Sequence, residues 1–215
     1  MNAHSSLLDN FSSMHDEFSS SNNRMIRSIN AIFDNEFKDL EDSLDYFNGE
    51  YLVIDKRELK VLIAEFKEKL LNDKVAHIKN YQKSFSKEVE LLKFTMCNFF
   101  EKKLVKGDNS KKKMSSEIKK IVDKMCDLNI LGFEEELDED VYNFKINFES
   151  KYIRDEYCKD DFNKVIRSFE HSLFEELRGL VLNSLTEKQE IVSRHARDAY
   201  DIIDGYRNKG IRRAS

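Results

Sequence analysis

One long segment limits the fold of this chain more than any other feature. Residues 56–106 contain neither proline nor glycine. Within them, large apolar residues recur every seven positions, at Leu71, Ile78, Phe85, Leu92 and Phe99. A sevenfold apolar repeat is typical of helices that pack along a coiled-coil seam. The segment therefore predicts one helix over about residues 56–105, roughly 75 Å long at 1.5 Å per residue.

Composition extends this argument to the whole chain. The 215 residues include no proline and six glycines, where ordinary usage would give roughly 11 and 15. Sandwiches and barrels need turn signals about every 8–12 residues, which so few turn formers cannot supply. We therefore predict an all-α fold. Its form would be an elongated antiparallel helical bundle or coiled coil, with two or three long helices and shorter helices packed beside them.

Local signals place the boundaries of these helices. Asn48-Gly49 predicts a left-handed helix stop. Asp55 and Glu58 form a capping box of the D-x-x-E type, and Ile54 with Leu59 fits a hydrophobic staple. Turn residues recur in the segment 107–110. We expect hairpins at about 48–54 and 106–114, with a shorter helix from about residue 115 to Gly132.

The first 24 residues form a serine-rich, heptad-like segment. Its apolar stripe is Leu7, Phe11, Met14 and Phe18, and Ser21 interrupts the stripe before Met25. Serine lowers helix propensity. Two interpretations stay open: a segment that becomes ordered only against a partner, or a frayed and weakly amphipathic terminus.

The second half of the chain contains one ambiguous segment and one long helical pattern. Residues 141–148 alternate like a strand and also fit a helical stripe. We choose helix, because no neighbouring segment resembles a partner strand. The helical pattern then continues toward residue 202, with a close contact or bend expected at Gly179 and a kink near 183–186. We thus expect a helical domain over 25–205 and an unstructured basic tail over 206–215.

Chemistry-bearing motifs are missing from the sequence. It contains no HExxH, no zinc-type Cys/His spacing, no Glu-x-x-His and no phosphate-binding glycine loop. We therefore expect a non-enzymatic protein without a cofactor or bound metal. Three cysteines, no CxxC and no signal peptide favour a cytoplasmic chain. The longest apolar runs are far shorter than the roughly 20 residues of a membrane-spanning helix.

Six lysines around the second hairpin are the candidate contact for a partner or an anionic surface: Lys102, Lys103, Lys106, Lys111, Lys112 and Lys113. Three interpretations stay open for this cluster. It is a solvated tip, it docks on the acidic segment 134–140, or it binds an anionic surface such as phospholipid headgroups.

These observations favour a structural or adaptor protein that acts through helical protein-protein surfaces. The heptad residues would form a self-association seam, so we expect a homodimer or a higher oligomer. An inhibitor that covers another protein's surface would have the same features. The net charge of −5 argues against a nucleic-acid partner.

The alternative is a module that binds a membrane surface. Long helices with lysines at a hairpin tip resemble a BAR-type domain in layout. The resemblance implies binding to anionic lipid through the lysine-rich tip.

Overall fold

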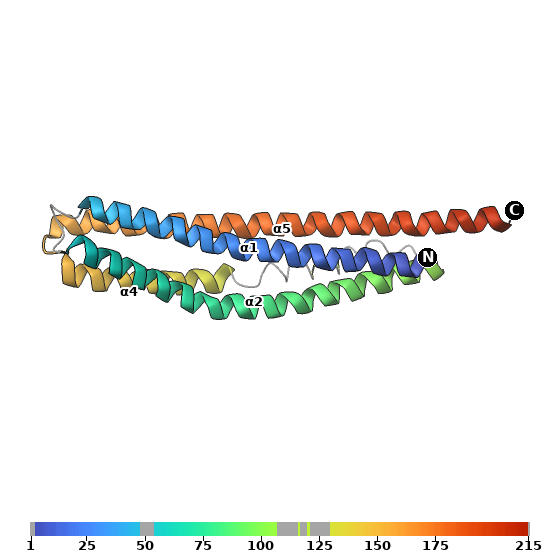
Figure 1. Cartoon of the computed structure of the whole chain (residues 1–215), viewed down its shortest axis with the longest axis horizontal. Coiled ribbons are helices and arrows are strands. Elements are labelled where there is room, and N and C mark those ends of the chain that lie inside the picture. Colours follow the sequence, from blue (N-terminus) through green and yellow to red (C-terminus); the bar gives the residue numbers. More distant parts are fainter. Residues whose placement is uncertain (1–2, 48–53, 107–115, 117–119, 121–129, 215) are drawn as a thin grey trace. The chain divides into compact units, whose positions relative to one another are not determined.

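The computed structural model of the chain describes residues 3–47, 54–106, 116, 120 and 130–214. Its long helices are α1 (Ala3–Phe47), α2 (Lys56–Lys106), α4 (Ile130–Tyr152) and α5 (Glu156–Ala214) (Figure 1). The described ranges contain no extended strand, so the predicted all-α helical bundle is confirmed. The expected second hairpin and most of the shorter helix after it lie outside the described residues.

The helices form two compact units. Unit 1 consists of Met1–Met25, Tyr81–Leu128 and Leu182–Ser215, and unit 2 consists of Ile26–Asn80 and Asn129–Val181. α1, α2 and α5 each contribute one part to each unit, whereas the described part of α4 belongs to unit 2. This division differs from the predicted segments 1–24, 25–205 and 206–215, because each unit combines segments that are distant in sequence.

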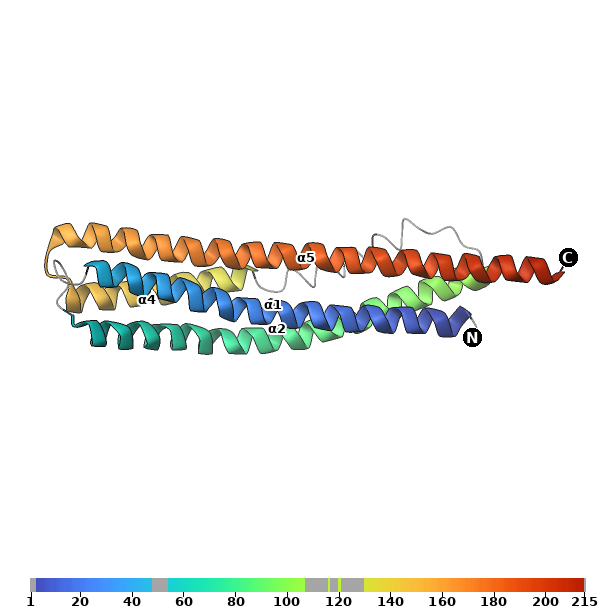
Figure 2. The same ribbon diagram turned by 45° about the horizontal axis from the view of Figure 1, so that its top comes forward.

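Four helices build the core of unit 2 (Figure 2). Aromatic rings join them: the ring centroids of Phe37 and Phe169 lie 5.0 Å apart, and those of Phe66 and Phe144 lie 4.1 Å apart. Such pairs add about 0.5–1.5 kcal/mol beyond the burial of apolar area. Several of the phenylalanines in the sequence thus form the contacts between helices in this unit.

Ion pairs show that α1 and α2 run antiparallel in unit 2. Lys60 Nζ lies 3.0 Å from Glu41 Oε1, and Lys67 Nζ lies 2.5 Å from Asp34 Oδ1. Lys56 contacts Asp45 nearer the hairpin. Residue numbers rise along one helix as they fall along the other, as the predicted first hairpin requires.

The cap at the start of α2 follows the sequence prediction in part. Asp55 Oδ1 accepts hydrogen bonds from the backbone N–H groups of Arg57 and Glu58, at 2.8 and 2.9 Å. Ile54 and Leu59 are both buried, as the staple requires. The Glu58 side chain has a different partner, because its Oε1 accepts a hydrogen bond from the Tyr152 hydroxyl of α4 at 2.9 Å.

The core of unit 1 contains the serine-rich N-terminal segment. Leu7, Phe11, Met14 and Phe18 of α1 pack with residues 85–100 of α2 and 191–203 of α5, and all four are at most 1% exposed. The segment begins a long helix, and its partner is the chain itself. The interpretation as a frayed terminus is wrong, because burial of four large side chains outweighs the low helix propensity of serine.

Helices continue through three positions at which the sequence predicted a change. α4 passes through Gly132, where a stop was predicted. α5 is helical through Gly179 and residues 183–186, and the bend and the kink predicted there stay predictions. α5 also continues to Ala214, so the predicted unstructured tail is wrong for residues 206–214. The physical reason is the modest cost of glycine inside a helix, about 1 kcal/mol. The helical interpretation of residues 141–148 is confirmed.

Candidate functional site

The residues of the predicted seam lie in different surroundings. Phe85 and Leu92 are buried in unit 1, and Phe99 is half-buried against the same core. Leu71 is half-buried against the core of unit 2, while the side chain of Ile78 lies outside the described residues. The described members thus contact helices of their own chain, and self-association through them stays a prediction.

The lysine cluster is only partly visible. Lys102 is exposed on α2. Lys103 and Lys106 lie in the last turns of α2, but their side chains are not among those that the structure describes. Lys111, Lys112 and Lys113 lie outside the described residues. The interpretations of this cluster, including the BAR-like alternative, therefore stay predictions.

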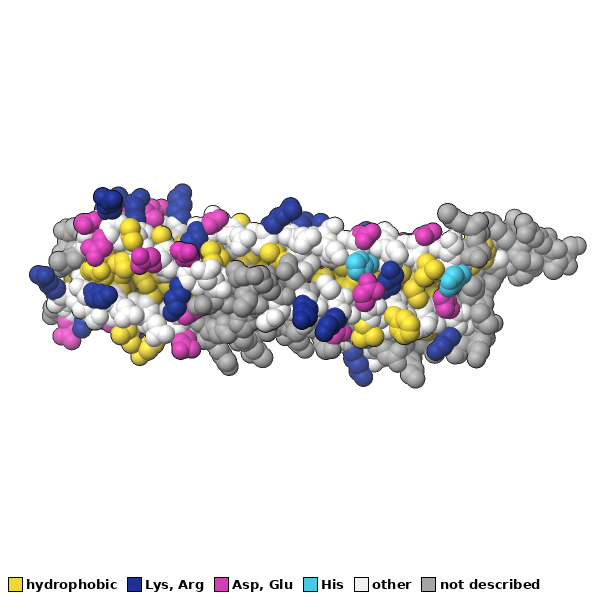
Figure 3. Space-filling model, turned by 60° about the horizontal axis from the view of Figure 1, so that its bottom comes forward, with side chains coloured by type: hydrophobic (Ala, Val, Ile, Leu, Met, Phe, Trp, Pro, Cys, Tyr) yellow, Lys and Arg dark blue, Asp and Glu magenta, His cyan; other side chains and the backbone are white. Residues whose placement is uncertain are grey.

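A group of exposed apolar side chains lies on α1 and α2 of unit 1. Leu8 is 40% exposed, Leu91 is 47% exposed and Phe94 is 65% exposed. We call these three residues the apolar patch. Figure 3 shows this face, with hydrophobic side chains exposed between two histidines that each lie beside an acidic side chain.

Two histidine–glutamate pairs frame the apolar patch. His4 Nδ1 lies 3.0 Å from Glu101 Oε1, and His15 Nε2 lies 3.2 Å from Glu90 Oε1. Each pair joins α1 to α2, so the two helices also run antiparallel in unit 1. The patch thus has a polar, charged boundary at both ends.

Helical spacing places the patch between these pairs. Leu8 lies four residues after His4 and seven before His15, which puts the three side chains on one face of α1. α2 repeats the same spacing around Phe94. Sequence reasoning missed the patch because it followed the buried stripe. The sequence contains the same spacing of four and then seven residues twice, in His4, Leu8 and His15 and in Glu90, Phe94 and Glu101. Only the fold shows that these two sets of residues lie on neighbouring helices.

Cys97 lies one turn from Phe94 on α2 and is half-buried. Burial raises the pKa of its thiol, and the nearby Glu101 carboxylate raises it further. The thiol therefore stays protonated near neutral pH and is a weak nucleophile.

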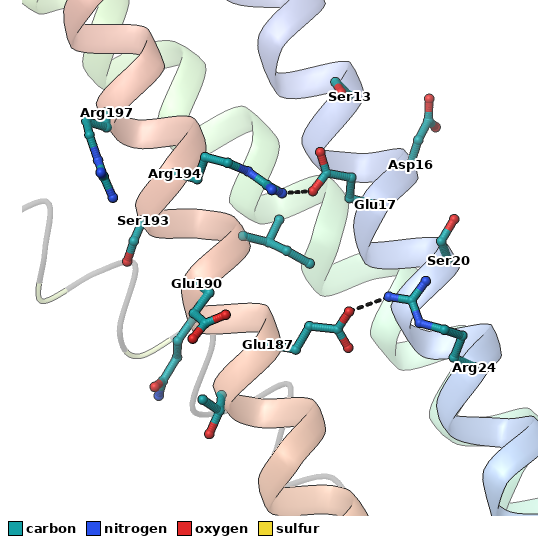
Figure 4. A pocket seen from close by; sticks show the side chains of 13 residues that line it. Ser13, Asp16, Glu17, Ser20, Arg24, Glu187, Glu190, Ser193, Arg194 and Arg197 are labelled. Atoms are coloured by element: carbon teal, nitrogen blue, oxygen red, sulfur yellow. Dashed lines mark hydrogen bonds and ion pairs between the residues drawn. The ribbon is translucent and has the colours of Figure 1, made fainter.

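A polar groove of about 920 Å³ lies between α1 and α5 of unit 1 (Figure 4). In it Glu17 contacts Arg194, and Arg24 contacts Glu187. The lining also includes serines, further carboxylates and Arg197. Because two of its arginines already contact carboxylates, the groove has no strong excess of either charge and does not select a ligand by charge.

Buried polar residues lie beside this groove. Ser21 donates a hydrogen bond of 2.6 Å to Glu187 Oε2. This bond, together with the neighbouring Arg24, lowers the pKa of the Glu187 carboxyl below its ordinary value, against the opposing effect of burial. Lys188, only 1% exposed, donates to Ser184 Oγ at 2.6 Å, and its Nζ lies 5.1 Å from the centre of the Phe85 ring. Around Ser21, Ser184 and Lys188, buried polar contacts thus take the place of apolar packing in unit 1.

Two further features concern metal ions and membranes in the described residues. They include no group of three or more His, Cys, Asp or Glu side chains placed to hold a metal ion. Among the described helices, none combines the length and the hydrophobicity needed to cross a membrane. No protein-family model matches this chain, and no curated protein matches it.

Proposed function

We propose that this protein is a non-enzymatic adaptor that binds other proteins, including a second copy of itself, through the apolar patch on α1 and α2. The observation that carries the proposal is the exposure of Phe94, Leu91 and Leu8 on the stretch of α1 and α2 that the two histidine–glutamate pairs frame. Single exposed apolar residues are ordinary, whereas a group of them within a polar boundary marks a contact surface.

The energetics of the patch favour a protein partner. Covering a largely exposed phenylalanine releases about 1.5–3 kcal/mol, and aromatic residues at the centre of an interface carry much of its binding energy. The two histidine–glutamate pairs offer polar contacts at the boundary of the patch. This arrangement of an apolar centre within a polar rim is typical of protein-protein interfaces.

The first experiment measures self-association of the full chain by light scattering over a range of concentrations. Phe94→Glu places a charge at the centre of the patch, and we expect it to weaken association by at least about thirtyfold, the effect of losing a residue worth 2 kcal/mol. Circular dichroism checks that the variant stays helical, as an exposed site should allow.

A matched control is Tyr142→Glu. Tyr142 is 59% exposed on α4 and belongs to unit 2, so this variant adds the same charge at an aromatic residue of similar exposure. We expect its association to equal that of the unmodified chain. Equal weakening by both variants would show a general effect of charge and would count against the patch.

A second experiment detects other protein partners in cells of the native host. A photoreactive amino acid is placed at position 94 in one variant and at position 142 in another. We expect discrete protein adducts from position 94 and few from position 142. If neither self-association nor adducts depend on position 94, the proposed function is wrong.

A further inference from the structure

The N-terminal part of α1 contains one apolar pattern twice. Residues 5–11 read SSLLDNF and residues 12–18 read SSMHDEF, so that Phe18 repeats Phe11 seven positions later. Both phenylalanines are buried in the core of unit 1. If α1 moved along its own axis by seven residues, about 10 Å at 1.5 Å per residue, Phe18 would take the place of Phe11. Apolar packing in unit 1 therefore does not by itself fix where α1 lies along its partners.

Charged residues along the edge of α1 that faces α5 do not repeat in this way. Glu17 and Arg24 are seven residues apart on α1, and Glu187 and Arg194 are seven residues apart on α5. Glu17 contacts Arg194, and Arg24 contacts Glu187 (Figure 4). The two helices are thus antiparallel here, and each of these four charges faces its opposite.

Moving α1 by seven residues in either direction would turn attraction into repulsion. In a forward shift, Arg24 would take the place of Glu17 and face Arg194. Glu17 would then face the position seven residues further along α5, which is Asp201. In a backward shift, Glu17 would take the place of Arg24 and face Glu187. Like charges on neighbouring helical positions destabilise a contact by about as much as opposite charges stabilise it.

Asn10 supports the observed placement of α1, although it is uncharged. Its Nδ2 donates a hydrogen bond of 2.8 Å to the backbone carbonyl of His195, and its Oδ1 lies 2.8 Å from Nδ1 of that residue. The forward shift would put Glu17 in the place of Asn10 and set a carboxylate against the carbonyl oxygen. The backward shift would put Ala3 there, whose side chain has no donor.

Ser21 adds a second contact that the backward shift would break. This serine is 1% exposed and donates a hydrogen bond of 2.6 Å to Glu187 Oε2. The backward shift would put Met14 in its place, and the Glu187 carboxylate would lose this donor. Hydrogen bonds to charged groups contribute more to stability than those between neutral groups, so Ser21 helps to exclude that shift.

We propose that these polar contacts set the register of α1 in unit 1, that is, which residues of α1 and α5 lie opposite each other. Polar residues that select one register among several equivalent apolar ones are known from coiled coils. The register also decides which α1 residue lies in the apolar patch, because a forward shift would put His15 in the place of Leu8. It holds whether or not the patch binds a partner.

The test exchanges the two charges of α1 in the full chain, by Glu17→Arg together with Arg24→Glu. This α1 variant keeps the composition and the net charge. It imposes on the observed register the like-charge contacts that a shift would create, so its loss of stability measures how strongly the charges disfavour a shift. We expect the opening equilibrium of residues 3–20, measured by hydrogen exchange, to rise at least about tenfold, as two exposed pairs change from attraction to repulsion.

A rescue variant shows whether pairing is the cause. Adding Glu187→Arg and Arg194→Glu to the α1 variant restores opposite charges at both contacts, and we expect most of the lost protection to return. An NMR contact between the rings of Phe11 and Phe100, whose centroids lie 5.7 Å apart, then confirms the observed register. If the α1 variant fails to fold, recovery of helix content and of this ring contact in the rescue variant still decides the question.

The matched control exchanges the same two charges where they join no helices. Glu175 and Arg178 form an ion pair within α5, and both belong to unit 2. Glu175→Arg with Arg178→Glu should leave the opening of residues 3–20 unchanged.

Salt separates a charge effect from a packing effect. The difference between the α1 variant and the unmodified chain should shrink in about 1 M salt, where the screening length is about 3 Å. A difference that salt does not change would come from packing and would overturn the proposal. Equal opening in the α1 variant and the unmodified chain, or a rescue variant that opens as much as the α1 variant, would also overturn it. None of these measurements depends on the apolar patch.

Discussion

At the scale of single residues, Ser21 shows how a break in an apolar pattern becomes a specific contact. The sequence marks Ser21 as an interruption of the N-terminal stripe, and the structure places it in the buried layer where it donates to Glu187. The two residues are 166 positions apart. The interruption was visible in the sequence, whereas its partner could be identified only from the fold.

Ser21→Ala should lower the free energy of unfolding by about 1.5–3 kcal/mol near neutral pH, since it removes one hydrogen bond to a charged group. It should also raise the pKa of Glu187, whose lowered value owes most to this bond. A carboxyl whose pKa is lower in the folded state than in the unfolded state stabilises the fold at pH values above its unfolded-state pKa. This stabilisation is lost as the pH falls through the folded-state pKa. The variant should thus lose less stability on acidification.

The measurements for this prediction are urea unfolding at several pH values and NMR titration of the Glu187 carboxyl. Ser20→Ala is the control, because Ser20 is exposed on the adjacent position of α1. An unchanged titration of Glu187 in Ser21→Ala would contradict the prediction.

At the scale of elements, glycines inside helices are the features that sequence reasoning judged least well. A Cβ atom added at Gly179 or Gly205 meets nothing within 4 Å. Neither position therefore needs glycine for a close approach, so the close contact expected at Gly179 is wrong, and the bend stays a prediction. A glycine ends a helix only where its backbone takes the left-handed conformation. The amino-acid sequence does not show which glycines do so.

Gly179→Ala should raise the free energy of unfolding by about 0.5–1 kcal/mol, because alanine loses less backbone entropy in a helix. Gly205→Ala should do the same for the last part of α5 and slow hydrogen exchange in residues 206–214. Thermal unfolding and hydrogen exchange are the measurements. A loss of stability at Gly179, or unchanged exchange after Gly205, would contradict the continuous α5 helix.

The boundaries of α2 were predicted more accurately than the continuity of α4 and α5 through their glycines. The cap at Asp55 depends on neighbours within a few residues, so the sequence contains all the information that it needs. The apolar patch and the His195 contacts depend on which faces of distant segments meet, and periodicity alone does not fix that. The sequence thus predicted the fold class and the start of α2, but neither candidate site.

At the scale of the whole molecule, the N-terminal segment has a different role from the one the sequence suggested. The serine-rich pattern predicts that removing residues 1–24 leaves the core folded and weakens only a partner contact. In the structure, this segment supplies the α1 share of the unit 1 core. Unit 2 contains none of these residues.

Deletion of residues 1–24 should therefore unfold or loosen unit 1 and leave unit 2 largely protected. Hydrogen exchange should increase in residues 85–100 and 191–203, because their buried side chains lose their α1 partners. Residues 29–44 and 162–177 should keep their protection. Unchanged exchange in 85–100 would contradict the prediction and would support a dispensable N-terminal segment.

The order of synthesis also decides which contacts of the two units can form first. Asp45 and Lys56 are 11 residues apart and meet early, whereas Asn10 and His195 are 185 residues apart. At about 5–20 residues per second, the first helix is made roughly 10 to 40 s before its last partner. During that interval the stripe from Leu7 to Phe18 lacks α5. We expect Ser12 and Ser13, between Phe11 and Met14, to lower the hydrophobicity of the nascent segment until α5 is synthesised.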